Sequence, residues 1–158
     1  MLIKKTLQIT TVALLSLASL MVHAVEVSDA WIREAPPAAQ MMGGFMTISN
    51  TSDKDEVLVG ASSATFMHIM LHRTVEKDGV SKMIHQDAVV IPAHSKVEFK
   101  PGDYHIMMPA PDKRLVVGDK VMVKLEFKSG KTVDVEYTVR KGMAMMHHGD
   151  GMKNMPKH

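Results

Sequence analysis

Alternating hydrophobic and polar positions run through most of this chain and predict short β-strands, with no convincing helix. The alternation is clearest towards the C-terminal end, in two runs at 121–128 and 133–139 that Ser129-Gly130 separates. In the first run the apolar positions are Val121, Val123, Leu125 and Phe127. Because successive side chains of a strand point to opposite faces, the two runs predict a β-hairpin with one buried face.

Upstream, shorter runs predict further strands. They lie at about 26–33, 44–50, 56–62, 66–73, 79–86, 88–91 and 96–100. Turn-forming residues punctuate them at Pro36-Pro37, Gly43-Gly44, Pro92, Pro101-Gly102 and Pro109 to Pro111. Many short strands with frequent turns are typical of an all-β antiparallel sandwich or barrel.

The two ends of the chain differ from this pattern. Residues 1–24 read as a cleavable signal peptide: Lys4 and Lys5 precede an apolar run, and Val22-His23-Ala24 fits the small-x-small cleavage rule. Residues 25–140 form the predicted domain. Residues 141–158 contain neither an aromatic nor a β-branched residue, so we expect a disordered tail.

Charge and cysteine content exclude several classes of partner and of site. Removal of the signal peptide takes Lys4 and Lys5 from the 19 basic residues and leaves 17 against 17 acidic ones. Nothing in this balance favours a nucleic acid or an anionic membrane as partner. The chain has no Cys, which excludes a disulfide scaffold, a blue-copper site and a lipid-anchoring Cys after the cut. We therefore expect a soluble, exported protein without a membrane anchor.

Methionine and histidine supply the candidate chemistry. His72 and Met83 have ten residues between them, Met83 and His105 have twenty-one, and one residue separates His105 from Met107. Neutral imidazole and thioether form a soft ligand set that suits Cu(I) and is poor for Mg²⁺ or Ca²⁺. The four residues His72, Met83, His105 and Met107 are the predicted core copper ligands.

This spacing resembles the signature of the periplasmic copper chaperone family called PCuAC. The resemblance covers about 29–139 and includes Asp78-Gly79-Val80 before Met83 and Pro101-Gly102-Asp103-Tyr104 before His105. The pattern departs from the family at Arg73, where the family often has Met. The resemblance implies a cupredoxin-like Greek-key β-sandwich in the periplasm. It also implies an acceptor for the copper: the CuA centre of cytochrome c oxidase, directly or through a Sco-type protein.

The alternation also suggests how the ligands meet. If Asp78-Gly79 is a two-residue turn, His72 lies opposite His85 and diagonal to Met83. His105 and Met107 would then come from an adjacent loop and project the same way. His68, in the same predicted row as His72, and His85 are each either auxiliary ligands or solvated strand residues.

Other notable residues have structural interpretations. We expect His94 to be an inert turn residue, Met108 to pack in the core, and Trp31 to be buried in the core, with shielding of the metal as the alternative for Trp31. Met46, Met67 and Met122 are interpreted as core filler.

The tail is a separate candidate metal-binding segment. Its composition resembles the His/Met-rich extensions of copper-handling proteins, with imidazoles for Cu(II) and thioethers for Cu(I). The auxiliary ligands proposed there are Met143, Met145, Met146, His147, His148, Met152, Met155 and His158.

Three other functions compete with a copper carrier. A copper-resistance or storage protein would bind the ion without delivering it, and the tail supports that alternative. An enzyme is disfavoured, because no activated Ser, Cys–His or paired-carboxylate motif is visible. A purely structural sandwich module would leave the four-residue spacing as coincidence. We also expect the fold to form without copper, because the alternating apolar rows supply a core.

Overall fold

The structure is a computed structural model that describes residues 24–142, so most of the predicted signal peptide and tail lie outside it. The described residues form ten strands and no helix, which confirms the predicted all-β class. Within this range there is also no helix with the length and hydrophobicity to cross a bilayer. The strands are β1 Val25–Arg33, β2 Met41–Asn50, β3 Glu56–Ser62, β4 Met70–Lys77, β5 Val80–His85, β6 Val89–Ile91, β7 Ser95–Phe99, β8 Tyr104–Pro109, β9 Lys120–Phe127 and β10 Thr132–Arg140.

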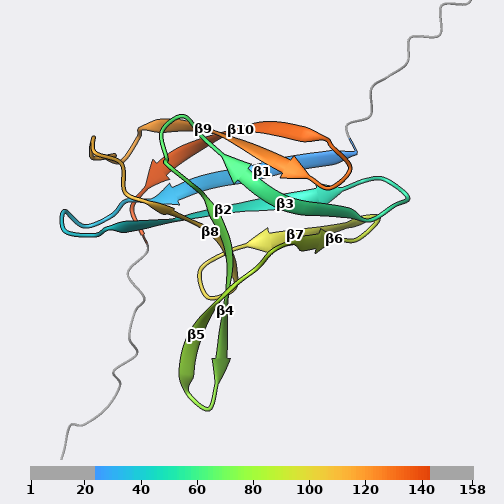
Figure 1. Cartoon of the computed structure of the whole chain (residues 1–158), viewed down its shortest axis with the longest axis horizontal. Coiled ribbons are helices and arrows are strands. Elements are labelled where there is room, and N and C mark those ends of the chain that lie inside the picture. The colour runs from blue at the N-terminus through green and yellow to red at the C-terminus, as the bar shows by residue number, and fades with distance from the viewer. Residues whose placement is uncertain (1–23, 143–158) are drawn as a thin grey trace, which may run out of the picture.

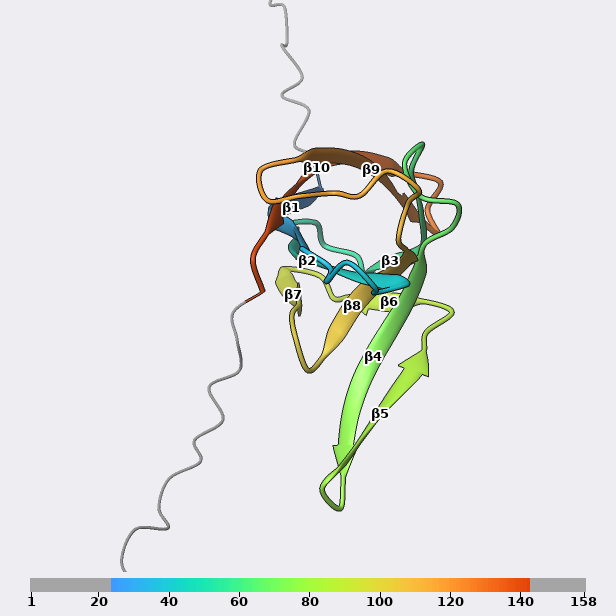
Figure 2. The same cartoon turned by 90° about the vertical axis from the view of Figure 1, so that its left-hand side faces the viewer.

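The strands form a continuous ladder that curls around the core. Their order is β5-β4-β8-β2-β1-β10-β9-β3-β6, and β7 pairs with β2 beside β8. All of these pairings are antiparallel except that of β1 with β10. The far end of the ladder returns to its middle, where β6 contacts β2 and β7. The β4–β5 hairpin projects from this rounded body (Figures 1 and 2).

The core follows the predicted alternation most closely in the β9–β10 hairpin, which is confirmed. Along β9, Val121, Val123, Leu125 and Phe127 are buried and the residues between them are exposed. Tyr137 on β10 is fully buried, and its hydroxyl donates a hydrogen bond to the sulfur of Met46 at 2.7 Å. The core therefore includes β9–β10 and β2, whereas the β4–β5 hairpin contributes only Leu71 to it.

The segment before β4 differs from the prediction. The strand begins at Met70 and not at 66, because Ser63 makes a turn: its hydroxyl donates to the carbonyl of Met122 at 2.7 Å and accepts from the amide of Thr65 at 3.2 Å. Met67 is consequently 92% exposed. Met122 is 53% exposed because it lies on the outward-facing side of β9, so the interpretation of both as core filler is wrong. Met46 is buried as expected.

Two further segments that the sequence predicts to be turns or loops are strands. Gly43 and Gly44 lie inside β2, because a Cβ at Gly44 would come within 2.6 Å of Ile106 Cγ1, and only glycine permits this approach of β2 to β8. The predicted loop that carries His105 and Met107 is strand β8, which pairs with both β2 and β4.

A nearly buried ion pair joins β3 to the β9–β10 turn. Glu56 accepts hydrogen bonds from Lys131 Nζ at 2.7 Å and from Ser129 Oγ at 2.9 Å, and only 8% of the residue is exposed. The bond from Lys131 lowers the pKa of Glu56; burial opposes the shift and Ser129 supports it. The folded state thus keeps this carboxylate ionised to a lower pH than the unfolded chain does.

We expect Glu56→Gln to lower the free energy of unfolding by about 1–3 kcal/mol at pH 7, because Lys131 would keep its charge without a partner. The contribution of Glu56 is present above the ordinary glutamate pKa of about 4.3 and is lost as the pH falls through its lower folded pKa. Urea denaturation of both proteins between pH 3 and pH 7 measures this.

The matched control is Glu136→Gln, which breaks an exposed Glu–Lys pair with Lys120 and should cost less than about 1 kcal/mol. A difference between wild type and Glu56→Gln that does not shrink at low pH would contradict the prediction.

Candidate metal centre

The β4–β5 hairpin carries half of the predicted ligands. Asp78 and Gly79 both have positive φ angles, 54° and 73°, as a two-residue type I′ turn requires. The register that follows places His72 opposite His85 and Thr74 opposite Met83. The predicted pairing of His72 with His85, with Met83 on the diagonal, is therefore confirmed.

Strand β8 completes the arrangement on the other side of β4. His72 also lies opposite His105, and Met70 lies opposite Met107. Because directly paired residues project to the same face of a sheet, His85, His72 and His105 form one line across three adjacent strands. We call these three residues the histidine row. The ring centroids of His72 and His85 are 5.5 Å apart, and those of His72 and His105 are 5.9 Å apart.

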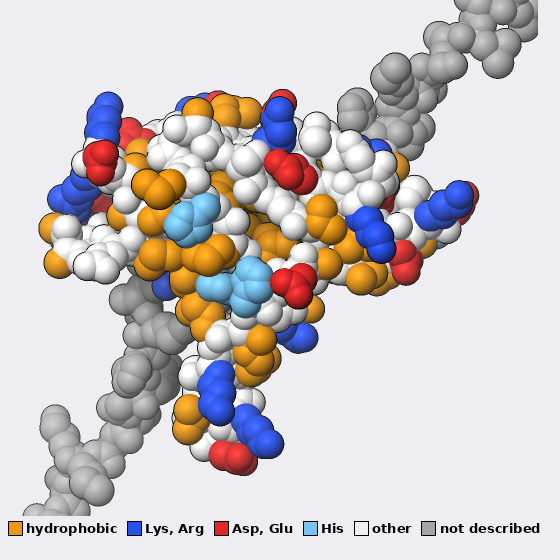
Figure 3. All heavy atoms as spheres, viewed as in Figure 1, with side chains coloured by type: hydrophobic (Ala, Val, Ile, Leu, Met, Phe, Trp, Pro, Cys, Tyr) orange, Lys and Arg blue, Asp and Glu red, His pale blue; other side chains and the backbone are white. Residues whose placement is uncertain are grey.

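Thioethers flank the histidine row. Met83 and Met107 line a cleft of about 530 Å³ together with His105. Met70, opposite Met107, lies on the same face and is a residue that the sequence analysis missed, because its pairing depends on β8. Figure 3 shows histidine side chains among hydrophobic ones close to the projecting hairpin. The structure thus brings all four predicted core ligands to one face.

The two inner imidazoles each have a nitrogen without a partner. His105 is buried, and its Nδ1 donates a hydrogen bond to the carbonyl of Asp103 at 2.9 Å, so the lone pair is on Nε2. His105 Nε2 and His72 Nδ1 are both buried without a hydrogen-bond partner. Unpaired buried polar atoms are rare in native proteins and call for an explanation. Two imidazole lone pairs beside two thioethers fit a soft metal ion.

Asp103, which precedes β8, and Arg73 on β4 together hold His105 in place. The carbonyl of Asp103 accepts both His105 Nδ1 and the amide of Thr74, at 3.1 Å. The carboxylate of Asp103 is held by Arg73 Nε at 2.9 Å, and the guanidinium of Arg73 lies over the ring of Tyr104 at 4.7 Å. Arg73 therefore projects away from the metal face and is a positioning residue, which the sequence analysis did not foresee.

The electrostatic setting keeps His72 neutral. Burial is the largest cause of its lowered pKa, and repulsion from the neighbouring imidazoles of His105 and His85 adds to the shift. A neutral imidazole is the form that binds metal. The row therefore presents a lone pair at His72 over a wider pH range than an isolated histidine would.

Aromatic side chains form the wall behind His105. The ring of Phe45 is 6.4 Å from that of His105 and 4.6 Å from that of Trp31. Trp31 is only partly buried, so its interpretation as a core residue needs correction. The guanidinium of Arg33 lies over Phe45 at 5.4 Å, and Arg33 lines the cleft.

The histidines His68 and His94 lie outside the histidine row. His68 is exposed and lies outside any strand, so the predicted row with His72 is wrong for it. His94 has a φ of 52° in a turn and contacts Asp53 at 2.7 Å. Met108 is fully buried, as expected. The auxiliary ligands predicted in the tail lie outside the described residues.

Across residues 24–142, no three His, Cys, Asp or Glu side chains come close enough together to hold a metal ion. His85 and His105 lie on opposite sides of His72, so they do not converge with it on one point. A copper ion on this face would thus need thioether ligands as well, and Met83, Met107 and Met70 are the methionines there.

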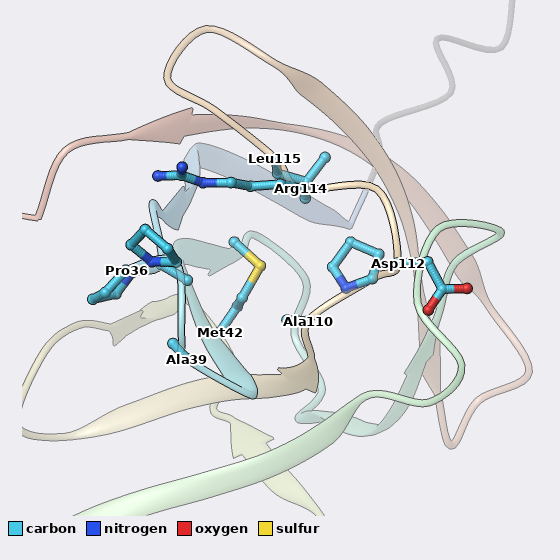
Figure 4. A pocket seen from close by; sticks show the side chains of 10 residues that line it. Pro36, Ala39, Met42, Ala110, Asp112, Arg114 and Leu115 are labelled. Atoms are coloured by element: carbon cyan, nitrogen blue, oxygen red, sulfur yellow. The ribbon is translucent and has the colours of Figure 1, made fainter.

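A second hollow, lined by Met42 of β2 and by the segment that follows β8, lacks this chemistry. Its volume is about 170 Å³, and prolines and small apolar residues line most of it (Figure 4). Met42 contributes the one thioether among the residues that line it, and no imidazole is among them. The cleft beside the histidine row is therefore the better candidate for a metal.

Comparison with protein families adds independent information. A family model described as "Putative lipoprotein LpqE-like" matches residues 25–139. A relative from Leifsonia xyli subsp. xyli, named a putative lipoprotein, is 34% identical over 117 residues, which are 73% of this chain and 69% of that protein. An uncharacterised protein of Rickettsia prowazekii is 36% identical over 84 residues, which are 52% of this chain and 46% of that protein.

Solved structures share the fold. The copper-bound PCuAC domain from PmoF2 has a TM-score of 0.64 at 22% identity, over 75% of this chain and 94% of that domain. The Cu(I) form of DR1885 from Deinococcus radiodurans has a TM-score of 0.62 at 28% identity, over 77% of this chain and 83% of that protein. The predicted cupredoxin-like β fold is confirmed by this likeness.

We expect the His72 imidazole to titrate below the ordinary histidine pKa of about 6.5, because burial and two neighbouring imidazoles disfavour its charged form. His85→Gln and His105→Gln should each raise this pKa. NMR titration of the imidazole signals in the metal-free protein measures the shift, with His94→Gln as a control outside the row. A His72 pKa that neither substitution moves would contradict the contribution of the neighbouring imidazoles and would leave burial as the cause.

Proposed function

The chain belongs to the LpqE-like family, and we propose that it is a periplasmic copper carrier that holds one Cu(I) and passes it on, without catalysing a reaction. The observation that carries the proposal is the pair of unpaired buried nitrogens, His72 Nδ1 and His105 Nε2, beside the thioethers of Met83 and Met107. These four residues are the proposed core ligands.

The donor set suits an ion that must be both held and released. Thioether and neutral imidazole match the softness of Cu(I), and neither needs to lose a proton at neutral pH when the imidazole pKa is low. None of the four ligands is a thiolate, because the chain has no Cys. An acceptor with thiolate ligands would therefore bind Cu(I) more strongly and take the ion by ligand exchange.

The acceptor that we propose is the CuA centre of cytochrome c oxidase, reached directly or through a Sco-type protein. The resemblance of the four-residue spacing to PCuAC copper chaperones supports this acceptor, and the 28% identity to a protein solved in its Cu(I) form supports the binding of Cu(I) itself. The basic and apolar start of the sequence supports export to the periplasm, where that centre is assembled.

Copper storage or resistance is the second candidate. The observation that favours it is the tail composition, in which Met143, Met145, Met146, His147 and His148 follow the domain closely in sequence. Such a segment would add capacity for copper, as Cu(I) on thioethers and Cu(II) on imidazoles. Transfer of copper from the loaded protein to an apo CuA subunit distinguishes the carrier from the store.

For the core site we expect X-ray absorption of the Cu(I)-loaded protein to show nitrogen and sulfur scattering together. Met83→Leu combined with Met107→Leu should remove the sulfur contribution from the core and weaken Cu(I) binding by about tenfold or more, since hydrocarbon replaces both thioethers. Chelator competition measures the affinity.

The control is Met122→Leu, since Met122 and Met83 are equally exposed, at 53%, and Met122 lies on β9 away from the cleft. To keep tail sulfur out of the spectrum, all three proteins carry Leu in place of the methionines at 143–158. A copper shell of nitrogen and oxygen only would refute the proposed core site.

For the tail we expect His147→Ala combined with His148→Ala to remove Cu(II) binding while the tight Cu(I) equivalent remains. The reason is that Cu(II) prefers imidazole, whereas the core holds Cu(I) with its own four ligands. Equilibrium dialysis under oxidising and reducing conditions measures both stoichiometries. Unchanged Cu(II) stoichiometry in the double variant would rule out the tail imidazoles as a copper site.

A further inference from the structure

The histidine row runs from the interior of the sheet to its free edge. His105 is 4% exposed, His72 is partly buried, and the side chain of His85 is 57% exposed. Strand β5, which carries His85, ends the ladder and pairs only with β4 among the described strands. Figure 2 shows this hairpin extending away from the body. The row therefore connects a protected position to an accessible one.

The ligands divide between two elements. Strand β8 carries His105 and Met107, whereas the β4–β5 hairpin carries His72, Met83 and His85. His72 is next to both other imidazoles, with centroid distances of 5.5 and 5.9 Å. Separations of about 5–6 Å suit two imidazoles that share one ion through metal–nitrogen bonds of about 2.0–2.1 Å. Each half of the row can thus hold an ion, but the two halves share His72.

We propose that His85 is the transfer ligand through which Cu(I) enters and leaves the site. The ion moves from the inner position, held by His72, Met83, His105 and Met107, to an outer position held by His72, Met83 and His85. This inference rests on the proposed function, because it concerns the route of the same ion. It assigns a role to a histidine that lies outside the four-residue spacing.

The step is a ligand exchange without redox chemistry. A bond forms between copper and an imidazole nitrogen of His85, and the bonds to His105 Nε2 and Met107 sulfur break. All ligands bind as neutral groups, so copper stays Cu(I) and no proton is transferred. His72 and Met83 keep the ion bound throughout.

This route predicts a kinetic signature. If His85 binds copper only in the transfer intermediate, its loss raises the barrier equally for loading and for release. Both rates should then fall by the same factor while the equilibrium affinity stays constant. An ordinary ligand of the resting site behaves differently, because its loss speeds release and weakens affinity together.

The test compares the full mature chain with its His85→Gln and His94→Gln variants. In each protein His147, His148 and His158 are changed to Gln and the methionines at 143–158 to Leu, so that neither imidazoles nor thioethers of the tail can take part. Each protein is loaded with one equivalent of Cu(I). Stopped-flow absorbance follows release to an excess of the chelator bathocuproine disulfonate and, in reverse, loading from a weak Cu(I) complex. We expect His85→Gln to slow both processes by about tenfold and to leave Kd within about twofold. His94→Gln, an exposed histidine in a turn, should match the parent.

Three results would overturn the inference: release as fast as in the parent, a Kd that weakens along with faster release, or the same slowing in His94→Gln. A circular dichroism spectrum and melting temperature like the parent's confirm that His85→Gln is folded, and Lys82→Gln on the same strand controls for local disruption. Failure of the proposed function would look different, because the parent itself would then bind no Cu(I) in the domain.

Discussion

The pairing of β4 with β5 on one side and with β8 on the other is the constraint on which the metal face depends. Strand side chains alternate between faces, so a slip of one residue in either ladder would turn His72 away from His85 or from His105. The β4–β5 register is held by the type I′ turn at Asp78-Gly79. The β4–β8 register is supported by Asp103, whose carbonyl accepts the amide of Thr74 across the two strands. One carbonyl therefore aligns the strands and also orients His105.

The fold class and the hairpin could be predicted from sequence because their signals are local. A period of two along 121–128 and 133–139, and an Asp-Gly pair between two strands, need only neighbouring residues to be interpreted. The predictions failed where a distant partner decides the outcome. Gly43-Gly44 has the sequence of a turn, yet it lies in a strand because Ile106 packs where a Cβ would be. Likewise, Pro101-Gly102 and Pro109 suggest a loop around His105, and only the pairing with β2 and β4 makes it a strand.

The candidate site divides in the same way. The four ligand types and their spacing are visible in the chain, and the diagonal of His72 and Met83 follows from a two-residue turn. The inclusion of His85 in a row of three, and of Met70 opposite Met107, follows from the long-range β4–β8 pairing, which no local pattern encodes. Arg73 shows most clearly which part of the site cannot be predicted from the sequence. From the sequence it is a departure from the family pattern, whereas in the structure it binds Asp103 and so supports His105 from behind the sheet.

A carrier must keep its shape when the ion leaves, and the distribution of burial meets this requirement. Every strand except β5 contributes buried residues to the core, and residues such as Ile32, Ile48 and Tyr137 have no access to solvent. Every residue of β5 is exposed, and of the four proposed core ligands only His105 is buried. Loss of copper would therefore remove few of the contacts that bury apolar surface, unlike in small zinc domains whose fold depends on the metal. The ligands with the most freedom to rearrange belong to the hairpin, while His105 stays fixed by Asp103. Separation of a rigid core from an exposed hairpin allows ligand exchange at the edge without unfolding the body.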